Sequence, residues 1–179
     1  AVTELELDIF ASRLGSVIAP AGCGKTQLIA DSLRQYKAVK PVLVLTHTNA
    51  GRAALDSRME RAGVPRSAYR SFTIDSWAGR VASRFPLRTG VSASVLRHEN
   101  KALDYPAIRQ GALRVLQCGD INDVLAATYH GVIVDEYQDC SLAQHGIIRA
   151  LSAPLPVCVL GDPLQAIFGF REPTVDWDL

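Results

Sequence analysis

The sequence predicts an α/β fold with three layers, in which helices cover both faces of a mostly parallel central sheet. Five short apolar runs have the composition of buried strands, and they alternate with segments of helical periodicity. The first run leads through a glycine-containing turn directly into a helix. The strands are expected at residues 16–19, 42–45, 70–74, 131–134 and 157–160. A chain of 179 residues fits one such domain.

Bulk composition is that of a globular chain. The hydrophobic share of 48% provides a core, and the net charge of +1 means that any contact with DNA must come from a local surface. The four cysteines show no CxxC spacing, which argues against a zinc site or a disulfide framework and favours a reducing compartment. No apolar run approaches membrane-spanning length and no signal peptide opens the chain, so we expect a cytoplasmic protein without a membrane partner.

Helical periodicity and capping residues predict helices along most of the chain. They are expected at about 25–35, 50–62, 76–84, 105–116, 121–128 and 142–151. Asn49 is the expected N-cap of the second helix and Asp120 that of the fifth, while either Asp75 or Ser76 would cap the third. Residues 1–13 are compatible with a short amphipathic helix. Residues 87–100 are polar and show no clear period, which indicates a loop or an insertion.

The stretch VIAPAGCGKT at residues 17–26 has the features of a phosphate loop, although Ala19 stands where GxxxxGK[ST] has its first glycine. Gly22 and Gly24 allow the backbone to approach a phosphate, Lys25 supplies a charge for the terminal phosphates, and Thr26 supplies a hydroxyl for Mg²⁺. An ordinary glycine turn is the alternative, and it is disfavoured because the motif follows a strand. The residues expected to hold the nucleotide are Pro20, Ala21, Gly22, Cys23, Gly24, Lys25 and Thr26.

A second motif, VIVDEYQD at residues 132–139, places two acids at the end of an apolar strand, as in a Walker B motif. The carboxyl ends of parallel strands are where such sheets bind ligands. Asp135 is expected to hold Mg²⁺, usually through water, and Glu136 to orient or deprotonate the attacking water. A solvated acidic turn is the alternative, which the upstream phosphate loop disfavours. The two motifs together predict binding of a nucleoside triphosphate with Mg²⁺.

The same motifs carry a family resemblance. The sequence DEYQD at 135–139 resembles the form found in the UvrD/Rep family of superfamily I DNA helicases. LTHTNA at 45–50 is similar to that family's motif Ia, TIDSW at 73–77 stands where its next DNA-contacting motif falls, and GDPLQAIFGFR at 161–171 resembles motif III. The resemblance implies a RecA-like P-loop NTPase domain that uses ATP and Mg²⁺ to act on single-stranded DNA.

The resemblance also implies roles for single residues. Gln165 would sense the γ-phosphate, completing a catalytic set with Lys25 and Glu136. Phe170, followed by Arg171, would stack on a single-stranded base, a contact worth ~1–3 kcal/mol; judged without the family, it is more simply a core residue. The remaining residues expected to contact the DNA strand are Thr46, His47, Thr48, Asn49, Thr73 and Ser76.

Several positions depart from the family pattern. His47 stands where a phenylalanine is usual, and Asp75 replaces a common histidine and adds negative charge near a phosphate path. Gln27 is the first glutamine of the chain, so the family's adenine-reading glutamine does not precede the phosphate loop in this sequence, and the preference for ATP over other triphosphates stays open.

The arginine fingers of this family belong to a second RecA-like domain, which the resemblance places after motif III. We therefore expect residues 1–179 to form the first RecA-like domain, with a reduced insertion around 86–128, and expect a second RecA-like domain or a partner chain to supply the arginines. Three hypotheses follow: a helicase or translocase motor domain, a nucleotide-gated DNA- or protein-binding module with little turnover, and a P-loop ATPase with a partner other than nucleic acid. Arg52, Arg58 and Arg61 form either a phosphate-facing stripe or a solvated helix face.

Overall fold

The computed structural model describes residues 9–10, 12–20, 22–37 and 39–165, with Gln165 described by its backbone. Within this part of the chain, five parallel strands form one sheet in the order β1-β5-β4-β2-β3. The strands are β1 (Leu14–Ile18), β2 (Val42–Thr46), β3 (Tyr69–Thr73), β4 (Val132–Val134) and β5 (Val157–Gly161). All five predicted strands are present, shifted by no more than two residues at either end.

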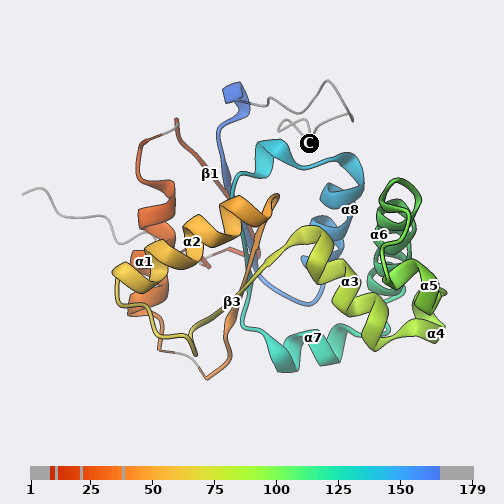
Figure 1. Cartoon of the computed structure of the whole chain (residues 1–179). Coiled ribbons are helices and arrows are strands. Elements are labelled where there is room, and N and C mark those ends of the chain that lie inside the picture. The colour runs from red at the N-terminus through yellow and green to blue at the C-terminus, as the bar shows by residue number, and fades with distance from the viewer. Residues whose placement is uncertain (1–8, 11, 21, 38, 166–179) are drawn as a thin grey trace, which may run out of the picture.

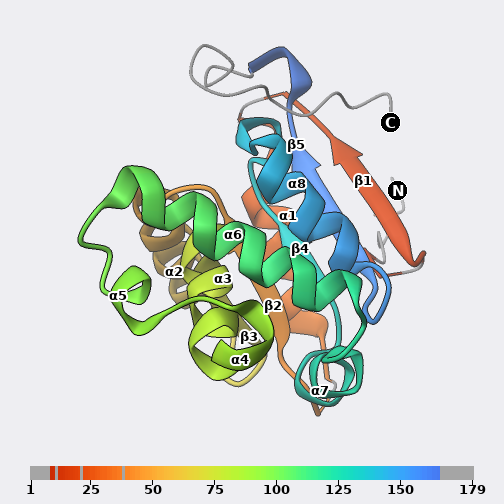
Figure 2. The same ribbon diagram turned by 90° about the vertical axis from the view of Figure 1, so that its right-hand side faces the viewer.

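The burial of the strands follows their place in the sheet. Every residue of β2, β4 and β5 is buried, as continuous apolar runs in a covered parallel sheet require. Strand β1 lies at an edge, where exposed residues alternate with half-buried ones. Figure 2 shows β1 on the outer side of β5, with α8 (Leu142–Leu151) lying over the face of the sheet.

Helices lie on both faces of the sheet, which confirms the predicted three-layer α/β/α arrangement (Figure 1). Helices α1 (Lys25–Gln35) and α2 (Asn49–Arg61) cover one face. The other face carries α3 (Ile74–Arg84), α6 (Lys101–Gln117), α7 (Asn122–Thr128) and α8. Short helices α4 (Pro86–Thr89) and α5 (Ala93–Leu96) join α3 to α6, and 3₁₀ turns η1 (Tyr137–Asp139) and η2 (Pro163–Gln165) follow β4 and β5. No helix in the described residues is long and apolar enough to cross a membrane.

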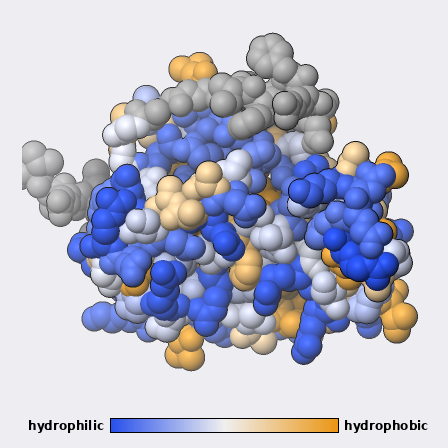
Figure 3. All heavy atoms as spheres, viewed as in Figure 1, coloured by the Kyte–Doolittle hydropathy of each residue, from blue (hydrophilic) through white to orange (hydrophobic). Residues whose placement is uncertain are grey.

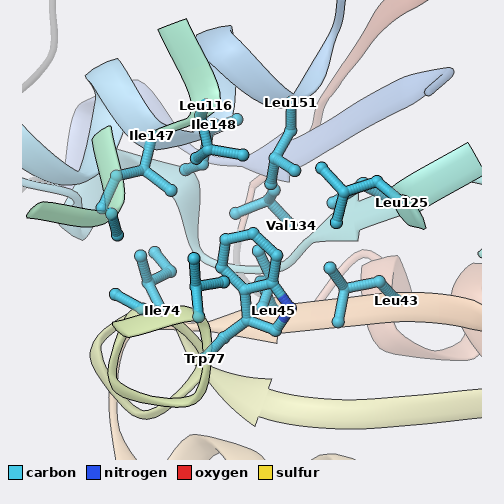
Figure 4. Packing of buried hydrophobic residues seen from close by; sticks show 14 of the residues in the cluster. Leu43, Leu45, Ile74, Trp77, Leu116, Leu125, Val134, Ile147, Ile148 and Leu151 are labelled. Atoms are coloured by element: carbon cyan, nitrogen blue, oxygen red, sulfur yellow. The ribbon is translucent and has the colours of Figure 1, made fainter. Parts of the chain in front are cut away.

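Two apolar clusters hold these layers together, one on each side of the sheet. In the larger cluster, Trp77 of α3 lies beside Leu45 of β2, and the α8 residues Ile147 and Leu151 belong to the same cluster (Figure 4). In the smaller cluster, helices α1 and α2 bury residues that include Leu33. Helices on both sides of the sheet therefore contribute apolar residues to the clusters that cover it, which is the packing that the alternation of strands and helices predicts.

Helix caps differ from the predicted ones in three places. The N-caps of α2 and α3 are Thr48 and Thr73, whose hydroxyls accept hydrogen bonds from Gly51 N (3.0 Å) and Ser76 N (3.1 Å). The predictions of Asn49 and of Asp75 or Ser76 are therefore wrong, because a threonine at or just beyond each strand end begins the helix sooner. Asp120 does not cap α7: Ile121 is the N-cap, and Asp120 pairs with Arg88.

The structure also differs from the prediction at the start of the chain, in the segment at 87–100 and at the start of α6. Residues 9, 10, 12 and 13 form turns and bends rather than a helix, and residues 1–8 lie outside the described part. The segment at 87–100, predicted as a loop or an insertion, holds most of α4 and all of α5. Pro86 opens α4 at a position that needs no N–H, and Gly90 closes it with φ 65°. Helix α6 begins at Lys101 rather than at Tyr105 and contains Pro106.

Candidate nucleotide and nucleic-acid site

The loop between β1 and α1 has the backbone geometry of an anion-binding turn. Gly22 and Gly24 have φ values of 78° and 84°, in the left-handed region that side chains disfavour. Gly24 is the N-cap of α1, no side chain caps this helix, and its first turn carries no acid. The positive end of α1 therefore faces no competing carboxylate of its own. Ala21 lies outside the described residues.

Lys25 is the first residue of α1, and only 8% of its surface is exposed. Its ammonium donates hydrogen bonds to the carbonyls of Ala19 (2.7 Å) and Pro20 (3.3 Å), so it lies against the loop it follows. Thr26 is half-buried beside it and Cys23 is exposed on the loop. The arrangement holds a cation and a hydroxyl at one helix terminus, a combination suited to a phosphorylated ligand.

Strand β5 lies between the strand of the phosphate loop and the strand of the Walker B motif. It pairs with β1 on one side and β4 on the other, and Ala19 N extends the β1 ladder by donating to Gly161 O (3.2 Å). Asp162, the next residue, is buried. The first acid of motif III thus follows the strand that separates the other two motifs.

Asp135 follows β4 and is 7% exposed, with its N–H bonded to Leu45 O (2.9 Å). Burial, and next to it the charge of Glu136, raise the pKa of its carboxyl to about 6. A hydrogen bond from Glu136 N (3.1 Å) and the charges of Lys25 and Arg58 act in the opposite direction. The carboxyl is therefore a poorly solvated acid close to the two cations, which is typical of functional sites.

Glu136 adopts a left-handed backbone conformation (φ 54°, ψ 48°), which is uncommon for a residue with a side chain. Its carboxylate accepts a hydrogen bond from Gln138 Nε2 (2.6 Å), and Gln138 Oε1 accepts one from Asp162 N (3.0 Å). Gln138 is buried and ties the turn after β4 to the turn after β5. It was not among the predicted site residues; its position within DEYQD was the available signal.

Five of the residues predicted to contact DNA line one hollow with a volume of about 1040 Å³. They are His47, Thr48, Asn49, Thr73 and Ser76. Thr46 is not in this lining and is buried at the end of β2. Figure 3 shows that the surrounding face is mainly hydrophilic, with apolar side chains scattered over it. Phe170 and Arg171 lie outside the described residues, and so does the side chain of Gln165.

Asp75, which the sequence placed as an added negative charge near the phosphate path, is neutralised by a partner. Arg109 of α6 binds both of its oxygens (2.7 and 2.8 Å), and Gln144 Nε2 donates to Oδ1 (3.2 Å). Gln144 also forms a capping box with Ser141 at the start of α8. The network joins α3, α6 and α8 and leaves Asp75 without a free charge.

Comparisons with known proteins show what this chain is similar to. Residues 95–177 match the model of the UvrD/REP helicase N-terminal domain. The chain is 41% identical over 76 residues to an ATP-dependent helicase/nuclease subunit of Lacticaseibacillus casei, covering 38% of this chain and 6% of that protein. It is 31% identical over 90 residues to the ATP-dependent helicase/nuclease subunit of the same name in Lactobacillus gasseri, covering 46% of this chain and 8% of that protein.

A third relative, the exonuclease/helicase subunit RexA of Lactococcus lactis subsp. cremoris, is 36% identical over 76 residues, covering 42% of this chain and 6% of that protein. The matched segments are thus a small fraction of these relatives. The matches and the all-parallel sheet agree with the resemblance that the motifs carry. Over residues 95–177 the chain is similar to the N-terminal domain of the UvrD/REP helicases, and its five-stranded parallel sheet with helices on both faces is consistent with the fold of a RecA-like P-loop NTPase.

Proposed function

We propose that the chain is the ATP- and Mg²⁺-binding motor domain of a UvrD-like DNA helicase or translocase, and that it couples ATP hydrolysis to movement on single-stranded DNA when a second RecA-like domain completes it. One observation carries the proposal. The phosphate loop, the Asp135–Glu136 turn and the Asp162 turn follow three neighbouring strands, and the hydrogen bonds of Ala19 and Gln138 connect them.

The residues that follow the carboxyl ends of β1, β4 and β5 fit a nucleoside triphosphate with Mg²⁺. The uncapped N-terminus of α1, the two glycines with positive φ and the Lys25 ammonium suit a polyphosphate. Thr26 and Asp135 offer the oxygen ligands that Mg²⁺ prefers, and Mg²⁺ in such sites keeps several waters and phosphate oxygens as further ligands. Bound Mg²⁺ would supply charge neutralisation for phosphoryl transfer.

The proposal also assigns residues to hydrolysis, to sensing of the γ-phosphate and to DNA binding. Glu136 orients or deprotonates the attacking water, and Gln138 fixes the direction of its carboxylate through the 2.6 Å hydrogen bond. Gln165, which follows Asp162 by three residues, senses the γ-phosphate. The hollow lined by His47, Thr48, Asn49, Thr73 and Ser76 receives the DNA strand, with Thr46, Phe170 and Arg171 as further contacts. Arginine fingers come from the second domain or a partner chain.

The test is ATP turnover with and without single-stranded DNA, measured together with nucleotide binding, for the wild-type chain and for Lys25→Ala. The matched control is Lys37→Ala, which removes an exposed lysine just beyond α1. We expect Lys25→Ala to lose nucleotide binding while its circular dichroism stays native, and Lys37→Ala to behave as wild type. Equal nucleotide affinity in wild type and Lys25→Ala would refute the placement of the phosphate loop.

The turnover measurement separates the motor domain from the binding module. DNA-stimulated turnover that Lys25→Ala abolishes supports a site completed by arginines from another copy. Nucleotide binding without turnover, restored by adding the second domain, supports half of a motor. Nucleotide binding that neither DNA nor the second domain converts into turnover would replace the motor by the nucleotide-gated module.

A further inference from the structure

We propose that the hollow continues along α3 as a second nucleic-acid subsite, where Arg80 and Arg84 bind phosphates of a strand that has passed Thr73 and Ser76. This inference rests on the proposed function, because it extends the DNA path suggested above. We call this part of the hollow the α3 groove. Its polar and basic lining on α3 includes Ser76, Ser83, Arg80 and Arg84, and Gly79 lies among them.

The α3 groove follows one face of one helix. Positions 76, 80 and 84 are four residues apart, so their side chains lie on the same side of α3. At 1.5 Å per residue, the stripe runs for about 12 Å from Ser76 to Arg84. Helix α7 contributes further residues to the lining of the same hollow, which include Val124 and Thr128. A DNA strand bound at the N-terminus of α3 could therefore continue along the same hollow instead of entering a separate pocket.

The charge of this groove favours a polyanion. Within the described residues, neither Arg80 nor Arg84 has a carboxylate partner. Asp75 is the only acid among the described residues that line the hollow, and Arg109 already binds both of its oxygens. Two guanidinium groups thus remain uncompensated on a wall without free negative charge, which suits a polyanion better than an apolar or basic protein segment.

Local packing positions one of these arginines. The Arg80 guanidinium lies 5.0 Å from the centre of the Phe72 ring on β3, a cation–π contact that restricts the side chain. Half-buried rings of Phe85, Tyr105 and Tyr129 also line the hollow. A basic groove with aromatic side chains on its walls is the arrangement that single-strand-binding proteins use. The occupant is therefore a single strand rather than a free phosphate.

The experiment measures binding of a labelled oligothymidylate over a series of salt concentrations by fluorescence anisotropy. The variant is Arg80→Ala/Arg84→Ala, and the matched control is Lys37→Ala/Arg149→Ala, which removes two exposed cations outside the groove. Each lost phosphate contact should reduce the slope of log K against log salt by about 0.7, so the variant slope should be shallower by about 1.4. The control should keep the wild-type slope.

A second arm uses oligonucleotide length. A longer oligothymidylate should bind wild type more tightly than a short one that fills only the 47–49, 73 and 76 region, and this gain should vanish in Arg80→Ala/Arg84→Ala. Arg80→Lys/Arg84→Lys should retain most of the slope because it keeps both charges. If wild type binds the oligothymidylate and Arg80→Ala/Arg84→Ala has the same salt slope as wild type, the α3 groove is refuted and the DNA path of the proposed function is not. If wild type does not bind the oligothymidylate, both are refuted.

Discussion

Replacing Asp135 by asparagine should stabilise the folded chain at neutral pH, although it removes a proposed metal ligand. The carboxyl is 7% exposed, and burial together with the Glu136 charge raises its pKa to about 6 from an ordinary value of 3.8. At about 1.36 kcal/mol for each pKa unit, ionised Asp135 costs the fold on the order of 3 kcal/mol. Asparagine keeps an oxygen that can accept the hydrogen bond from Glu136 N, so the cost is removed without orphaning that donor.

The pH dependence gives this prediction its sign. Between pH 3.8 and about 6, the unfolded chain loses the proton of Asp135 while the folded chain retains it, so the free energy of unfolding falls as the pH rises. Below this range both states are protonated and the penalty is absent. Above it the penalty is fully present. The stabilisation by Asp135→Asn should therefore grow from near zero to its full value across this window.

The assay is urea unfolding followed by circular dichroism at about pH 4 and about pH 8, without Mg²⁺ or nucleotide, because either ligand would add its own binding energy. The control is Asp123→Asn, which alters an exposed carboxylate on α7 and should change the free energy of unfolding by less than about 0.5 kcal/mol. An Asp135→Asn protein that is no more stable than wild type near pH 8, or equally stabilised at both pH values, would refute the reasoning.

Three further outcomes follow from the geometry. Alkylation of exposed Cys23 by a bulky maleimide, located by mass spectrometry, should block nucleotide binding, and bound nucleotide should protect the thiol; normal binding by the adduct would contradict the loop assignment. Glu136→Gln should bind nucleotide with Mg²⁺ but lose any turnover, and unchanged turnover would remove Glu136 from its role. Gly111→Ala should destabilise the chain by about 1–3 kcal/mol in urea unfolding, because the new Cβ would lie 2.6 Å from Val91, whereas Gly79→Ala meets nothing within 4 Å and should not be destabilising.

Periodicity predicted the sheet well because strands buried on both faces leave a continuous apolar run in the sequence. It predicted the helix starts less well. Thr48 and Thr73 each follow or end a β-strand, and whether such a residue extends the strand or caps the next helix depends on where the ladder stops. For Thr73 both are true: it pairs with Thr46 in the ladder and its hydroxyl caps α3. The local sequence shows which residues are able to cap a helix, but it does not show at which residue the hydrogen bonds of the β-ladder end.

Some residues of the candidate site could be predicted from the sequence and others could not. Motif residues on the phosphate loop and after β4 could be named from the sequence, because each motif is continuous and follows a strand. Arg109 could not, since it lies 34 residues from Asp75 and only the packing of α6 against α3 brings them together. The sequence therefore suggested a charge near the DNA path where the fold has an ion pair. Partners distant along the chain decide whether a motif residue presents its charge.

Strand order accounts for the way three separate motifs can act on one ligand. Periodicity predicts that β1, β4 and β5 are parallel, but it does not reveal that β5 lies between the other two. With β5 in the middle, the Asp162 turn is flanked by the phosphate loop on one side and the Asp135–Glu136 turn on the other. Gln138 then holds the Glu136 carboxylate and Asp162 N at once, so a displacement of either turn strains the other. In the proposed motor, the Gln138 side chain would transmit a change at the phosphates to the residues after β5.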